Sequence, residues 1–198
     1  MTSILETIGQ ALGKDEVRSI SRQIGADERA TANALDTSLP ALIGALNRNA
    51  SQGGGAQDIF NAVARDHDGS LLDHLGDFIS HSQDGPGEGI LGHLFGNRRP
   101  TVEAGLSRAS GLDGGTMGKL LSILAPVVMG AIGKAQRSSH LDAGGLGRLL
   151  NDESRKVEQT NPQAMGSLSR LLDADNDGDV DLGDLTRHGF GLLSKLLH

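Results

Sequence analysis

Apolar residues recur along the chain mainly at the three- and four-residue spacing of an α-helix, and strict alternation of apolar and polar residues is almost absent. Because a half-buried strand requires that alternation, the pattern predicts an all-α protein. Ser3 and Glu6 form a capping-box pattern that opens a first helix, and Lys14 lies at the predicted boundary of a second. Gly25 followed by Asp27 predicts the end of one helix and the immediate start of another, since glycine favours the C′ position and aspartate the N-cap.

The helical pattern occurs twice, at a constant offset of 86 residues. The apolar stretch 39–46 corresponds to 125–132, and each stretch has a proline at its second position. The match predicts a pseudo-repeated helical bundle with copies at about 1–80 and 88–159. Each copy would contain a short helix pair followed by a long apolar helix. Chance similarity among helices rich in Leu, Ala and Gly is the alternative interpretation.

Clusters of Gly, Pro, Ser and Asp divide the chain further. Residues 51–55 and 82–89 are expected to be loops, and the second loop is expected to join the two copies. We expect the copies to pack together as one helical domain over residues 1–160. Residues 161–198 then form a separate helix–loop–helix.

The most apolar stretch, residues 120–133, is uncharged for 14 residues. A helix that spans a membrane needs about 20 apolar residues, so this stretch is expected to be too short to span and to form a buried helix. Pro126, and Pro40 at the corresponding place in the first copy, are expected to kink or restart their helices, because proline removes a backbone donor. Gly44 and Gly130 should allow another backbone to approach closely.

Two Leu- and Gly-rich segments, residues 90–96 (ILGHLFG) and 124–134 (LAPVVMGAIGK), resemble the bacterial YidB-like family, catalogued as domain of unknown function 937. The resemblance covers most of residues 1–160. It implies a helical bacterial protein, and it brings neither an activity nor a catalytic residue.

Residues 173–184 follow the pattern of a calcium-binding loop position by position. Carboxylates stand at loop positions 1, 3, 5, 7, 9 and 12, Gly178 at position 6 and Val180 at position 8. A hard dication requires six to eight oxygen ligands, and the glycine makes the turn that folds them around it. The predicted metal-binding residues are Asp173, Asp175, Asp177, Asp179, Asp181 and Asp184.

Apolar periodicity on both sides of this loop predicts an EF-hand-like helix–loop–helix, which is also similar to the loop of dockerin modules. Asp184 at position 12 is shorter than the usual glutamate, so Ca²⁺ is expected with Mg²⁺ as a possible substitute.

The residue at position 8 of an EF-hand usually pairs with its equivalent in a second loop, and Val180 has no such partner loop in the chain. Homodimerisation through Val180, or docking of this unit on the helical domain, would supply one. Residues 66–71 resemble a second loop, but they lack its ligands at positions 1 and 12.

Charge and composition narrow the choice of partners. The net charge of −7 argues against nucleic acid as the main partner. Six of these negative charges lie in the loop, which has no Lys or Arg, so the rest of the chain carries a net charge of only −1. The chain has no cysteine, which excludes thiolate metal sites. Its first residues lack the pattern of a secretory signal, so a cytoplasmic location without a transmembrane segment is expected.

Other motifs are weaker. His74, Asp77 and His81 would share one helical face and could hold a transition metal, but the polar face of an amphipathic helix is the favoured interpretation. Residues 87–92 match the dinucleotide glycine pattern, yet they follow no strand.

The sequence therefore favours a non-enzymatic helical calcium-binding protein, whose ion orders the C-terminal helix pair. One alternative is a helical interaction or assembly scaffold in which calcium is only structural, with a protein partner or a second copy bound. An uncharacterised enzyme is the less favoured alternative.

Overall fold

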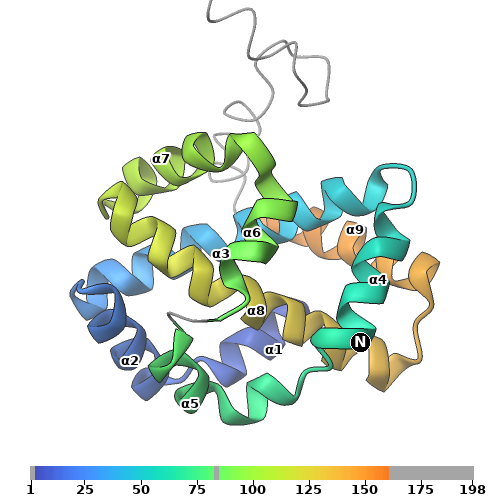
Figure 1. Ribbon diagram of the computed structural model, residues 1–198, viewed down its shortest axis with the longest axis horizontal. Helices are drawn as coiled ribbons and strands as arrows, with labels where there is room; N and C mark the ends of the chain where they lie inside the picture. Colours follow the sequence, from blue (N-terminus) through green and yellow to red (C-terminus); the bar gives the residue numbers. More distant parts are fainter. Residues whose placement is uncertain (1–2, 83–84, 161–198) are drawn as a thin grey trace, which may run out of the picture.

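The computed structural model describes residues 3–82 and 85–160, and within these residues the protein is all-α, as the apolar spacing predicts (Figure 1). The short 3₁₀ helices η1 and η3 interrupt the α-helices. The elements are α1 (Ile4–Ala11), α2 (Lys14–Ile24), α3 (Glu28–Ser51), α4 (Gly55–Asp66), η1 (Ser70–His74), α5 (Leu75–Ser80), α6 (Gly87–Phe95), η3 (Gly96–Arg98), α7 (Arg99–Ser110), α8 (Gly114–Ser139) and α9 (Ala143–Thr160).

Helix α8 forms the centre of the body, and Figure 1 shows it crossing the middle of the molecule with α7, α2 and α4 around it. It contacts α1, α2, α3, α4, α6, α7 and η1. Leu120, Leu121 and Leu124 are fully buried in it, as is Ile132. Each such side chain contributes about 1.5–3 kcal/mol through burial, so this helix supplies much of the core. One continuous cluster of buried side chains extends from α1 to α9.

The expectation that this segment is too short to span a membrane does not hold for the whole helix, because the helix is longer than the uncharged stretch. Further helical turns that include polar residues extend the uncharged stretch at both ends, and the whole helix, α8, has 26 residues. Within the part of the chain that the structure describes, α8 is the one helix long and apolar enough to cross a membrane. Of its most apolar 18-residue window, 72% is buried inside the body, as in the core helix of a folded domain.

The long helices α3 and α8 continue through their prolines, so the restart allowed by the sequence does not occur. Residues on both sides of Pro40 and Pro126 are buried, and packing holds the helix across the missing donor. In α8 the proline deprives the Ser122 carbonyl of its usual helical donor. Gly87 of α6 approaches this carbonyl so closely that an added Cβ would lie 1.9 Å from the oxygen. The proline therefore coincides with a close approach between two helices.

The predicted helix ends are present. Gly25 and Gly111 adopt left-handed conformations, with φ of 77° and 83°, and end α2 and α7. The Asp27 carboxylate accepts a hydrogen bond from Ala30 N–H at 2.9 Å, and the Asp113 carboxylate accepts one from Thr116 N–H at 3.0 Å. The bounds of α2 and α3, shifted by 86 residues, fall within one or two residues of those of α7 and α8. The two-copy organisation stays a prediction, and these bounds agree with what it requires.

Two local predictions need correction. Residues 82–89 are not all loop, because α6 begins at Gly87 and Ser122 of α8 packs against its first turn. The helix expected to present His74, Asp77 and His81 on one face is not α-helical throughout: the 3₁₀ helix η1 extends to His74, and the α-helix begins only at Leu75. The close approach expected at Gly130 does occur. A Cβ added to Gly130 would lie 3.8 Å from the Cα atom of Gly69, which directly precedes η1.

Candidate functional site

The six predicted calcium ligands, Asp173, Asp175, Asp177, Asp179, Asp181 and Asp184, lie outside the described residues. Helix α9, the last described element, ends at Thr160. The candidate sites below therefore belong to the helical body.

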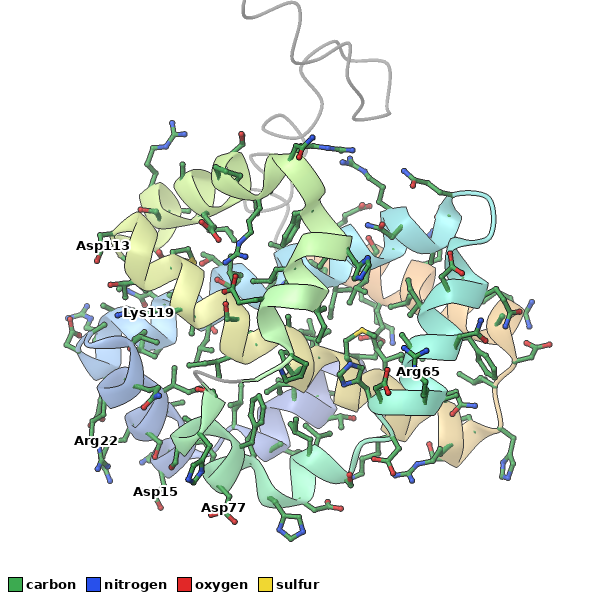
Figure 2. All side chains as sticks on the ribbon, in the orientation of Figure 1. Asp15, Arg22, Arg65, Asp77, Asp113 and Lys119 are labelled. Atoms are coloured by element: carbon green, nitrogen blue, oxygen red, sulfur yellow. The ribbon has the colours of Figure 1, made fainter. Side chains whose placement is uncertain are left out.

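No group of three or more His, Asp or Glu side chains in the described residues could hold a metal ion. The structure thus does not assemble His74, Asp77 and His81 into the transition-metal site weighed above. Nδ1 of His81 lies 2.9 Å from the backbone oxygen of Asp77, which is a local helical contact. Figure 2 shows Asp77 at the outer edge of the body, as expected for a polar helix face.

A buried carboxylate connects the first and last described helices. Glu153 of α9 is 1% exposed and accepts hydrogen bonds from the Ser3 hydroxyl at 2.5 Å and from Ile4 N–H at 3.0 Å. Lys156 donates to its other oxygen at 2.9 Å, and this bond raises the pKa of the Lys156 ammonium. Glu6 accepts from Ser3 N–H at 3.0 Å, which is one half of the predicted capping box. Glu153 is thus a cap for the N-terminus of α1, where the helix dipole favours negative charge.

A polar cleft of about 500 Å³ lies where α6, α7 and α8 meet. The Arg99 guanidinium donates two hydrogen bonds to Glu88, one of them at 2.9 Å, and a third to Glu103 at 2.6 Å. The Ser122 hydroxyl also donates to Glu88. The bonds from Arg99 and then Ser122 lower the pKa of Glu88 to about 2. Lys119 of α8 lies at the edge of this cleft (Figure 2).

These pairings limit what the polar cleft can do. An ionised carboxylate whose pKa is about 2 is a poor general base at neutral pH, because a base works best when its pKa is near the working pH. Arg99 is already bonded to two carboxylates and has little capacity left for an anionic substrate. The cluster therefore acts as an ion-pair junction that joins three helices.

A second pocket of about 500 Å³ opens between the end of α3, α4, α6 and α8, and its lining is mainly apolar. Ile59, Ile90, Leu94 and Met129 form much of its wall. Met129 is 4% exposed and belongs to the core, so the pocket reaches the central helix. Its volume lies within the range of about 300–1,000 Å³ that is usual for small-molecule sites.

Polar groups are few in this apolar pocket and lie along its wall. His67, which follows α4, is half-buried, and that burial lowers the pKa of its imidazole, so the ring is neutral at pH 7. The backbone of His67 packs against α8, since an added Cβ on Gly133 would lie 1.8 Å from the His67 oxygen. Asn49 uses its Nδ2 to donate to the backbone oxygens of Ala45, at 2.9 Å, and Leu94, at 3.2 Å. Its amide oxygen is therefore available as an acceptor.

Sequence reasoning missed both clefts and the Glu153 cap. Glu88 lies in a segment interpreted as loop, and Glu153 lies in a run of polar residues that gives no sign of burial. Their partners are distant along the chain: Ser122 is 34 residues from Glu88, and Ser3 is 150 residues from Glu153. Such contacts become visible only when the packing of helices is known.

Comparison with known proteins gives one relationship. A family model described as "Bacterial protein of unknown function (DUF937)" matches residues 6–135, from α1 to most of α8. No curated protein and no solved structure matches the chain.

Proposed function

Because the chain belongs to the bacterial DUF937 family, whose function is unknown, we propose a function from its own residues: it is a non-enzymatic calcium-binding protein with a helical body and a C-terminal EF-hand-like loop. The observation that carries this proposal is the spacing of six aspartates and one glycine over residues 173–184. The ion would offset repulsion among the carboxylates and order the helix pair on either side of the loop.

The donor set of the loop fits a hard cation. The proposed ligands are all oxygens, and the chain contains no cysteine that would favour a softer metal. Asp173, Asp175 and Asp177 are assigned as direct ligands and Asp179 as a ligand through its backbone carbonyl. Asp181 would act through a water and Asp184 from the following helix.

The identity of the ion depends on position 12. A bidentate glutamate at this position gives Ca²⁺ its high coordination number, and Asp184 has a shorter side chain. The loop is therefore proposed to prefer Ca²⁺ less strongly than a glutamate loop does, and Mg²⁺ would compete. The Asp184→Glu variant should increase the preference for Ca²⁺, as measured by calcium titration with and without Mg²⁺.

The helical body supports a binding role better than a catalytic one. Its most perturbed acid, Glu88, is an ionised carboxylate paired with Arg99, and its most buried acid, Glu153, caps a helix. Both groups are used in holding helices together. This observation favours the non-enzymatic interpretation over the enzyme alternative.

Circular dichroism of the full chain tests the proposal. After treatment with a chelator, addition of Ca²⁺ should increase the helical signal and raise the Tm by mass action. Asp173→Ala should abolish both changes, whereas Asp152→Ala, a matched change at an exposed aspartate of α9, should preserve them. An equal response from the Asp173→Ala variant and the parent would contradict the proposal.

The scaffold alternative predicts a different observation. If the body mainly binds a second copy or a protein partner and calcium is only structural, the particle mass should be independent of the ion. Light scattering of the full chain with Ca²⁺ and with chelator measures this directly. A Ca²⁺-dependent change in mass would instead indicate that the loop controls assembly, for example through Val180.

A further inference from the structure

We propose that the apolar pocket between α3, α4, α6 and α8 binds a small amphipathic amine, with an apolar body inside the pocket and a protonated amino group at Asp58. This pocket belongs to the helical body, so the proposal is independent of the calcium loop. Three features of the pocket carry the inference: its shape, its apolar wall and the sign of its polar groups.

The shape of the pocket depends on the glycine-rich turn between α3 and α4. Gly54 has φ of 87°, a left-handed conformation that glycine adopts without strain. Gly55, the first residue of α4, lies so close to α3 that an added Cβ would be 1.8 Å from the Asn49 oxygen. This turn places the first turns of α4 beside the end of α3, and Gln52, Gly53 and Gly55 all line the pocket.

The wall supplies the affinity for an apolar body. Ile90 and Leu94 of α6 are only partly buried in the body, and both line the pocket. A ligand that covers them removes apolar surface from water, and this burial favours binding. Ile59 and Met129 are only 8% and 4% exposed even without a ligand, so they form a packed floor of the pocket. The volume of about 500 Å³ accommodates an alkyl chain or a ring, and is too small for a helix of a protein partner.

The polar groups select the head of the ligand. Among the described residues that line this pocket, Asp58 is the one carboxylate, and none is a Lys or Arg. The Asp58 side chain forms no ion pair or hydrogen bond within the described part of the chain. The Asn49 amide nitrogen donates to two backbone oxygens, so its amide oxygen is the acceptor that remains, and no donor among the described residues bonds to that oxygen. Two imidazoles, His67 and His93, also line the pocket, and burial lowers the pKa of the His67 ring, which disfavours a positive charge on that ring at pH 7.

This combination complements an ammonium group and opposes a carboxylate. An ammonium at the wall gains an ion pair with Asp58 and a hydrogen bond to Asn49, whereas a carboxylate meets a like charge. A single exposed ion pair contributes only modestly to affinity. Because attraction of one ligand and repulsion of the other act together, the two ligands should differ about tenfold in Kd.

The probes are hexylamine, hexanoate and hexan-1-ol, which share an alkyl chain and differ in the head group. Amide chemical shifts of the full-length, ¹⁵N-labelled protein at pH 7 report both Kd and location. We expect hexylamine to bind about tenfold more tightly than hexanoate, with hexan-1-ol between them. The largest shifts should fall on α4, α6 and the turn at residues 52–55.

Two variants make the test specific. Asp58→Asn should bring the Kd of hexylamine to that of hexan-1-ol while hexan-1-ol binding stays unchanged. Asp152→Asn removes the same charge at an exposed position on α9 and should keep the tenfold preference. The proposal is overturned if hexanoate binds as tightly as hexylamine, if Asp58→Asn keeps the preference, if the shifts fall elsewhere, or if no probe binds at millimolar concentration.

Discussion

At the scale of single residues, stability depends on buried polar groups whose partners are far away in the sequence. Glu153 accepts from Ser3, Ile4 and Lys156, so one side chain holds the first helix against the last described one. An unmade hydrogen bond at a buried polar atom costs about 1–3 kcal/mol. The polar run around Glu153 in the sequence predicts an exposed helix face, and only the packing of α1 on α9 explains its burial.

The Glu153→Gln variant tests this cap. We expect the free energy of unfolding to fall by about 1–3 kcal/mol, because the amide accepts more weakly and presents donors to Ser3 and Ile4. Urea denaturation followed by circular dichroism gives the value. Glu158→Gln, an exposed position one turn further along α9, is the control and should change stability by less than about 0.5 kcal/mol. Equal stability of the two variants would contradict the cap.

Glu88 gives a prediction for pH dependence. The bonds from Arg99 and Ser122 lower its folded-state pKa to about 2, below its ordinary value of 4.5. Its contribution is therefore fully present above about pH 4.5 and is lost as the pH falls from there toward 2. In Glu88→Gln, the Tm should be lower than in the parent at neutral pH, and the difference should shrink below about pH 4. Thermal melts across this pH range measure both, and a pH-independent difference would contradict the prediction.

At the scale of the elements, the helix ends could be predicted but the contacts between helices could not. Asp27, Asp113, Gly25 and Gly111 act locally, through bonds within three or four residues, so the sequence reveals them. The start of α6 within a supposed loop depends instead on its contact with α8, which carries no local signal. Of the kink or restart expected at the prolines, the restart does not occur for the same reason: burial of residues before and after each proline outweighs one missing donor.

Close helix contacts through glycine are the second element-scale feature. A Cβ at Gly133 would lie 1.8 Å from the His67 backbone oxygen, so Gly133→Ala must displace the turn that leads into η1. We expect a loss of at least about 1–3 kcal/mol in the free energy of unfolding, as for overpacking in a core. Guanidinium denaturation measures the change.

Gly92 on α6 is the matched control for Gly133. It is exposed and within a helix, and an added Cβ there meets nothing within 4 Å. Gly92→Ala should therefore stabilise the protein by up to about 1 kcal/mol, since alanine is the better helix former. If both substitutions stabilise the protein, the contact of α8 with the His67 turn is not tight.

At the scale of the whole molecule, the sequence predicts the all-α class and the burial of the apolar segment of α8, because both depend on periodicity and composition. It does not predict the apolar pocket, which forms where four helices meet, or the polar cleft, which forms where three helices meet. The charge is divided unevenly: the loop at residues 173–184 carries a net charge of −6, residues 1–160 carry −4, and the remaining residues on either side of the loop carry +3. This division is what the calcium proposal explains.

Calorimetric titration of the chelator-treated full chain with Ca²⁺ tests the central proposal most directly. We expect about one ion bound per chain, with binding lost in Asp173→Ala and retained in Asp152→Ala. The absence of any Ca²⁺ binding up to millimolar concentration would contradict it.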